Sequence, residues 1–70
     1  MKNDYYRVEY NSQYPYKKRA VWHTLVGWES NSLENTIRDL NRSTGPGTVL
    51  GDRAKYRIMK VTVEEVKEEK

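Results

Sequence analysis

Residues 30–43 read Ser-Asn-Ser-Leu-Glu-Asn-Thr-Ile-Arg-Asp-Leu-Asn-Arg-Ser, and this stretch decides the fold because it predicts a helix. Each of the first three residues can cap a helix, and Asn31 followed by Glu34 has the spacing of a capping box. Apolar side chains then follow at i, i+4 and i+7, at Leu33, Ile37 and Leu40. This spacing predicts that all three lie on one stripe of a helix of about three turns.

Two strands are predicted before the helix. Residues 4–10 alternate in the period of a half-buried strand, with Tyr6, Val8 and Tyr10 on one face. Residues 19–28 are rich in β-branched and aromatic residues and predict a second strand. Simple alternation in this strand places Trp22, Val26 and Trp28 on one face, and Val21, His23 and Leu25 on the other. The intervening residues 11–18 suit a hairpin loop, because they include Tyr14-Pro15-Tyr16.

One strand is predicted after the helix. Gly45-Pro46-Gly47 cannot continue a helix, so residues 44–53 are expected to form a long loop. Residues 55–63 resume strand character, with Ile58 and Met59 on opposite faces unless a bulge intervenes. The order β-β-α-β predicts an α+β fold with a three-stranded antiparallel sheet in the order 2-1-3 and one helix packed on one face. Both outer edges of this sheet would be open, which makes homodimerisation through an edge an option.

Length and composition limit the chain to one small domain. It has 70 residues and no cysteine, so we expect a single α+β domain over residues 1–63, without disulfides and of marginal stability. Residues 64–70 hold four Glu and two Lys and are expected to form a charged, frayed tail behind a basic body. With no apolar run long enough for a signal peptide or membrane span, the sequence favours a cytoplasmic protein and no membrane partner.

Catalysis, cofactors and metals are not expected. His23 is the only histidine, no nucleophile is placed beside it by the sequence, and the carboxylates are not paired at any motif spacing. A single histidine without a thiolate cannot provide the usual four ligands of a structural zinc site. We therefore expect a protein that binds a partner and is not an enzyme.

The aromatic and basic residues predict a partner-binding surface. Five tyrosines lie within the first sixteen residues, and a three-stranded sheet with one covered face cannot bury them together with two tryptophans. Exposed rings beside cations are typical anchors of protein interfaces. The residues expected to bind a partner are Tyr14, Tyr16, Lys18, Arg19, Trp22, Arg57 and Lys60.

Two alternatives use neighbouring residues. The same cations and rings could bind nucleic acid, and affinity would then fall steeply with salt, whereas an aromatic protein interface would change far less. The glycine-rich loop between Arg42 and Arg53 could instead hold a small phosphorylated ligand. The residues expected for that anion site are Arg42, Gly45, Gly47 and Arg53.

Two parts of the sequence carry a resemblance: the final strand, Tyr-Arg-Ile-Met-Lys-Val-Thr-Val-Glu-Glu at residues 56–65, and Trp28 before the Ser-Leu-Glu helix start. Together they resemble a layout found among small accessory proteins encoded by bacteriophages. In that layout a strand ending in Trp leads to a short helix, and a terminal strand closes the sheet. The resemblance implies a role in inhibiting or modulating a host protein, a defence system or transcription by direct binding, inside a bacterial host. It implies no catalytic residue.

Overall fold

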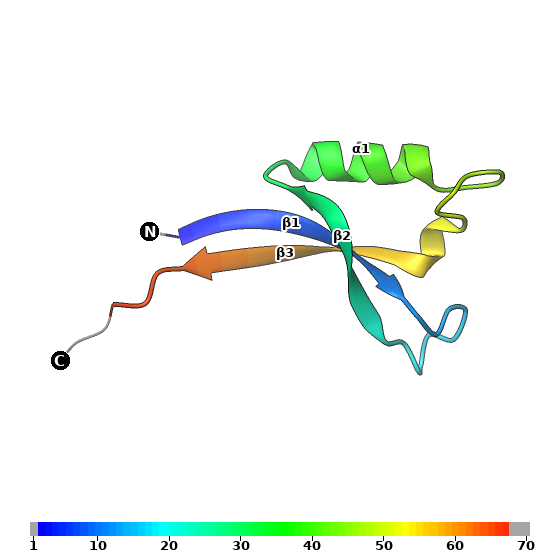
Figure 1. The fold of residues 1–70 in the computed structure, drawn as a ribbon, viewed down its shortest axis with the longest axis horizontal. Coiled ribbons are helices and arrows are strands. Elements are labelled where there is room, and N and C mark those ends of the chain that lie inside the picture. The colour runs from blue at the N-terminus through cyan, green and yellow to red at the C-terminus, as the bar shows by residue number, and fades with distance from the viewer. Residues whose placement is uncertain (1, 68–70) are drawn as a thin grey trace.

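The structure, a computed structural model, describes residues 2–67 and has the predicted β-β-α-β order (Figure 1). Its elements are β1 (Lys2–Asn11), β2 (Trp22–Ser30), α1 (Leu33–Ser43), the short 3₁₀ helix η1 (Arg53–Lys55) and β3 (Tyr56–Glu64). The sheet order is β2-β1-β3, and β1 pairs antiparallel with both neighbours. The predicted fold class, strand order and central position of the first strand are confirmed.

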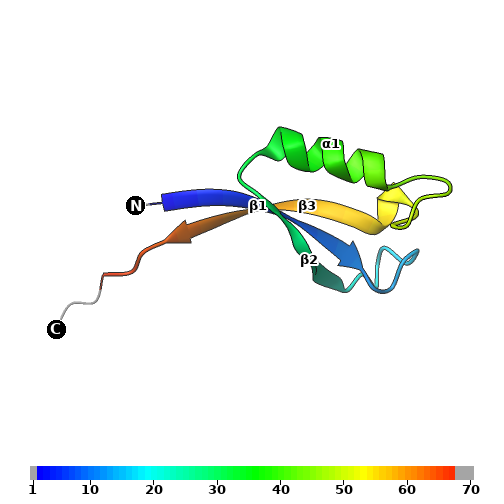
Figure 2. The same ribbon diagram turned by 45° about the horizontal axis from the view of Figure 1, so that its top comes forward.

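The sheet is longer than the helix that covers it. Strands β1 and β3 pair without interruption from Lys2 opposite Glu64 to Tyr10 opposite Tyr56, but β2 joins only from Tyr6 onward. Residues 2–5 and 61–64 therefore form a two-stranded ribbon that projects beyond α1 and β2, as both views show (Figures 1 and 2). The radius of gyration, 14.8 Å, exceeds the roughly 11 Å of a compact chain of this length.

A bulge in β2 changes which side chains reach the core. Between Arg7 and Glu9 of β1, the pairing on β2 jumps from Glu29 to Thr24, so β2 carries three additional residues there. Gly27 absorbs the irregularity with a φ of 88°, a conformation that favours glycine. As a result Leu25 and Trp28 both pack against the core. The prediction that Trp22 and Trp28 share a face is wrong, because strict alternation ends at the bulge.

The core is small and lies between α1 and the sheet. Val8 and Leu40 are fully buried and Tyr56 is nearly so. The Tyr56 hydroxyl donates to the carbonyl of Leu50 at 2.6 Å, and burial raises the pKa of this tyrosine. Five partly buried side chains complete the cluster: Tyr10, Leu25, Trp28, Leu50 and Ile58. A core of this size is expected to contribute only a few kcal/mol of net stability, about 3–5.

The apolar stripe predicted for the helix is only partly buried. Leu40 is in the core, but Leu33 and Ile37 are each 40% exposed, and Thr36 is buried in their place. Thr36 lines a hollow beside β2, and Ile37 is turned about 100° away from it around the helix. The helix packs mainly on β1 and β2, and Thr36, not Ile37, is the buried residue.

The helix cap is one of the three predicted candidates, but it is not the residue that has capping-box spacing to Glu34. The side chain of Ser32, and not that of Asn31, caps α1, because Ser32 Oγ accepts from the backbone N–H of Asn35 at 3.2 Å. At the other end of the chain β3 reaches Glu64, one residue beyond the predicted domain boundary. Residues 65–67 have no regular secondary structure, and the rest of the predicted tail, residues 68–70, lies outside the described residues.

Candidate binding surface

The side of the sheet opposite α1, here called the uncovered face, carries apolar side chains along the ribbon. Side chains alternate along a strand, and Val8, Tyr10, Tyr56 and Ile58 point toward the helix. The unbroken register between β1 and β3 therefore turns the alternate residues away from it. The apolar residues of β1 and β3 on the uncovered face are Tyr5, Val61 and Val63 in the ribbon and Met59 directly next to it.

The other side of the same ribbon is polar. Lys60 Nζ lies 3.4 Å from a carboxylate oxygen of Asp4, and the Thr62 hydroxyl donates to the second oxygen at 2.8 Å. The hydrogen bond from Thr62, aided by the charge of Lys60, lowers the pKa of Asp4. The ribbon is thus amphipathic, but its polar side lies on the same side of the sheet as α1 and its apolar side lies on the uncovered face. This arrangement is typical of a surface that a partner covers.

A cluster of charged side chains lies at the centre of the uncovered face. Glu9 is only 5% exposed. One of its carboxylate oxygens contacts Arg7 Nη2 at 2.9 Å, and the other contacts Arg57 Nη2 at 2.7 Å. The Nε atom of each arginine donates to the same oxygen as its Nη2, so both guanidinium groups approach side-on. We call these three residues the Arg–Glu–Arg cluster.

Trp22 extends this cluster. The guanidinium carbon of Arg57 lies 4.2 Å from the centre of the indole ring, within the range of a cation–π contact. Glu9 is therefore covered by two guanidinium groups, and one of these carries the ring of Trp22. Glu9 could not be identified from the sequence, because its partner Arg57 is 48 residues away and the sequence does not define the pairing register.

The loop between β1 and β2 is organised by Asn11, which is 4% exposed. Its side-chain oxygen accepts from the backbone N–H groups of Gln13 at 2.9 Å and Val21 at 3.1 Å, and its amide donates to the carbonyl of Tyr16 at 3.1 Å. Tyr16 itself is 65% exposed. The loop also exposes Lys18 and Arg19. The predicted aromatic and basic loop surface is therefore present beside the Trp22 end of the uncovered face.

A second loop is tied to this one through Tyr14. The Tyr14 hydroxyl donates to Asp52, which precedes η1. This hydrogen bond raises the pKa of Tyr14 and, together with the backbone N–H of Ala54, lowers the pKa of Asp52. A lowered carboxyl pKa stabilises the folded protein above the ordinary carboxyl pKa of 3.8, and this contribution is lost as the pH falls through the lowered value.

Replacing Tyr14 with phenylalanine is expected to raise the pKa of Asp52 toward 3.8 without fully restoring it, because the bond from Ala54 remains. A carboxyl-carbon NMR titration across this pH range measures the shift. Tyr16→Phe is the matched control, since that ring is on the same loop and, within residues 2–67, makes no hydrogen bond to Asp52. Equal Asp52 titration curves for Tyr14→Phe and the unmodified protein would contradict the link.

Only some of the residues predicted to bind a partner come together. Trp22 and Arg57 are in contact, and Tyr14 lines a hollow of about 240 Å³ that Trp22 also lines. Tyr16, Lys18 and Arg19 lie exposed on the adjoining loop. Lys60 belongs to a different surface, because it lies on the helix side of the sheet and is paired with Asp4.

The residues predicted for an anion site do not converge. The backbone N–H of Gly45 donates to the carbonyl of Gly51 at 2.7 Å, so it is already used within the loop. Arg53 donates to Asn41 and to the carbonyl of Tyr56, each at 3.1 Å. The loop surrounds a hollow of about 520 Å³ that is lined by Gly45 and Gly47 but by neither Arg42 nor Arg53. Asp52 is the one charged residue on its lining, which disfavours an anion.

His23 has a hydroxyl neighbour that the sequence did not predict. Its ring stacks on Tyr10 with 5.4 Å between centroids, and its Nε2 lies 3.2 Å from Ser12 Oγ. The same hydroxyl lies 3.3 Å from the carbonyl of Val21 and can donate to it. The contact is exposed. Among residues 2–67 no group of three His, Cys, Asp or Glu side chains could hold a metal ion.

Comparison of the chain with protein-family models, with curated proteins and with solved structures finds no match. Within the described part of the chain, no helix has the length and apolar character needed to cross a membrane.

Proposed function

We propose that this protein is a non-catalytic protein-binding module, and that its uncovered face is the docking surface. The observation that carries the proposal is the reversed polarity of the ribbon. Val61 and Val63 face away from the helix, whereas Thr62 between them faces as the helix does and bonds to Asp4. An apolar strip with no covering layer costs free energy in water unless a partner buries it.

The surface also indicates the chemistry of the partner. The apolar strip of Met59, Val61 and Val63 lies next to the Arg–Glu–Arg cluster, which has one carboxylate for two guanidinium groups. The neighbouring loop adds Lys18 and Arg19. We therefore propose a partner protein with an apolar patch bordered by carboxylates. A modulator of a bacterial host protein, as the resemblance to phage accessory proteins implies, is the finer form of this proposal.

The test uses Val61→Lys and Val63→Lys, with Thr62→Lys as the matched control on the other side of the same strand. Partners retained from a nuclease-treated bacterial lysate are identified by mass spectrometry and purified, and their affinity for each variant is measured directly. We expect each valine variant to bind at least about tenfold more weakly, since a central apolar contact is lost. The control is expected to bind within about twofold of the unmodified protein.

Equal affinity for the valine variants and the control would overturn the proposal. Salt provides a second criterion. A protein partner is expected to lose less than about tenfold in affinity between 50 and 200 mM salt, whereas a nucleic acid held by six or more phosphate contacts would lose about a thousandfold or more. Retention that disappears after nuclease treatment would likewise favour a nucleic-acid binder.

A further inference from the structure

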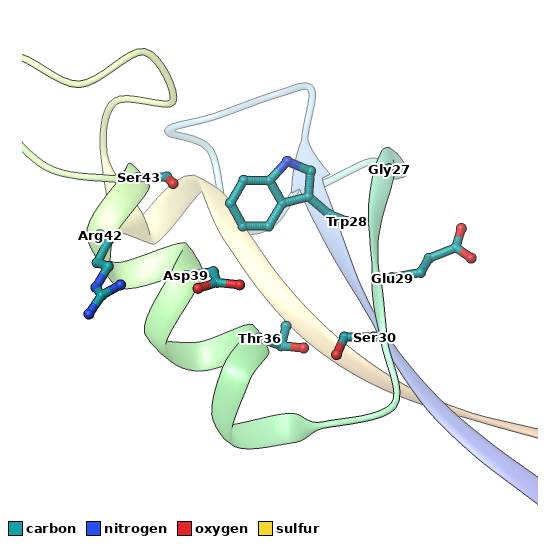
Figure 3. A pocket seen from close by; sticks show the side chains of 8 residues that line it. All are labelled: Gly27, Trp28, Glu29, Ser30, Thr36, Asp39, Arg42 and Ser43. Atoms are coloured by element: carbon teal, nitrogen blue, oxygen red, sulfur yellow. The ribbon is translucent and has the colours of Figure 1, made fainter.

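A hollow of about 370 Å³ lies between the outer edge of β2 and α1, away from the uncovered face. Its strand side is formed by residues 27–30, and its helix side includes Thr36, Asp39 and Ser43. Figure 3 shows the indole of Trp28 over the space between the two elements and the carboxylate of Asp39 on the helix side that faces β2. The volume falls in the range typical of ligand sites, about 300–1,000 Å³.

The strand along this hollow has an open edge. β2 pairs with β1 on one side, and among residues 2–67 no strand lies on its other side. Beyond the bulge at Gly27, Glu29 and Ser30 pair regularly with Arg7 and Tyr6, and the outward backbone groups of this end of β2 can pair with an extended chain. A strand added there would lie about 4.8 Å from β2, with every second side chain directed toward the helix layer.

The side chains of the hollow favour a cation. Trp28 provides an aromatic wall, and Asp39 provides a carboxylate. The Nε atom of Arg38 lies 3.9 Å from this carboxylate, at an exposed position. Arg42 also lines the hollow, but its guanidinium is directed away from Trp28 in Figure 3. An aromatic face with a nearby carboxylate attracts the ammonium of lysine or the guanidinium of arginine.

We propose that this groove binds an extended peptide as a fourth strand beside β2, with a lysine or arginine side chain between Trp28 and Asp39. The backbone of β2 would provide the general affinity, and the hollow would select the basic side chain. This site is separate from the uncovered face and does not depend on the proposed function.

The test is an NMR titration of the isotope-labelled protein with the peptide acetyl-Thr-Val-Lys-Val-Thr-amide. We expect the largest shifts at the backbone amides of residues 27–30 and at the indole N–H of Trp28. Replacing the peptide lysine with norleucine, which keeps the aliphatic chain and removes the charge, is expected to weaken binding on the order of tenfold. Asp39→Asn is expected to have a similar effect.

Glu34→Gln is the matched control, because it removes a carboxylate from the same helix at a residue that does not line this hollow. Equal binding of the lysine and norleucine peptides, shifts centred on β3, or no shifts at millimolar peptide would each overturn the proposal. So would concentration-dependent shifts of residues 27–30 without peptide, because a second copy of the chain would then occupy the edge. Val61→Lys should leave the peptide affinity unchanged, which separates this site from the uncovered face.

Discussion

Replacing Leu40 with alanine is expected to leave much of the protein unfolded at 25 °C. Leu40 is one of two fully buried side chains among the described residues, and it joins α1 to Val8 in the sheet. Truncating a buried leucine to alanine costs about 2–5 kcal/mol. A domain of this size has only about 3–5 kcal/mol of stability from its core, so the loss is comparable to the whole. Urea unfolding followed by circular dichroism measures it.

Ile37→Ala is the control for this prediction. It shortens an aliphatic side chain on the same helix, three residues earlier, but Ile37 is 40% exposed. Its replacement is expected to cost less than about 1 kcal/mol, near the range of surface substitutions. If Ile37→Ala were as destabilising as Leu40→Ala, the buried stripe predicted from the sequence would be correct and the observed helix orientation would be wrong.

The order of elements could be predicted because each has a strong local signal. The period of two in residues 4–10 and the capping residues before Leu33 act within a few positions, so neighbouring residues determine the element. The strand order then followed from strand direction: a helix returning across the sheet lays the third strand parallel to the second, and pairing the third strand beside the first makes every neighbouring pair antiparallel.

The details that failed depend on contacts between distant residues. The bulge at Gly27 was missed because alternation assumes an unbroken strand, although an isolated glycine within a strand is a known sign of a bulge. The burial of Thr36 instead of Ile37 depends on how the helix rests on β1 and β2. Helical spacing identifies which residues share a face, but it does not identify how that face is turned toward a narrow sheet.

The candidate surface was predictable only where it depends on neighbouring residues. Exposed Tyr16, Lys18 and Arg19 follow from the loop, and alternation alone separates Lys60 from Arg57. The Arg–Glu–Arg cluster was not predicted, because Ile58 and Met59 left the register of β3 open in the sequence. The structure shows that β3 has two partly buried faces and pairs with β1 without a bulge, which brings Arg57 opposite Glu9.

Replacing Glu9 with glutamine is expected to be the second most destabilising of the changes considered. The substitution keeps the shape of the side chain but removes the negative charge that both guanidinium groups contact at 2.7–2.9 Å. Losing one partner of a buried ion pair costs about 3–5 kcal/mol. Here the side chains of Arg7 and Arg57 are 35% and 40% exposed, so water screens part of the effect and we expect about 2–3 kcal/mol.

Glu34→Gln is the control for this change, because it makes the same chemical substitution at an exposed carboxylate and is expected to stay within about 0.5 kcal/mol of the unmodified protein. Urea unfolding of both variants gives the difference, and the indole N–H signal of Trp22 reports whether Arg57 still lies against the ring. Equal stability of the two variants would mean that the cluster behaves as an ordinary surface ion pair. A stable Glu9→Gln variant with a shifted Trp22 signal would mean that Glu9 mainly positions Arg57 and Trp22 on the uncovered face. If instead stability falls and the Trp22 signal moves with it, the cluster both supports the sheet and shapes the centre of the uncovered face.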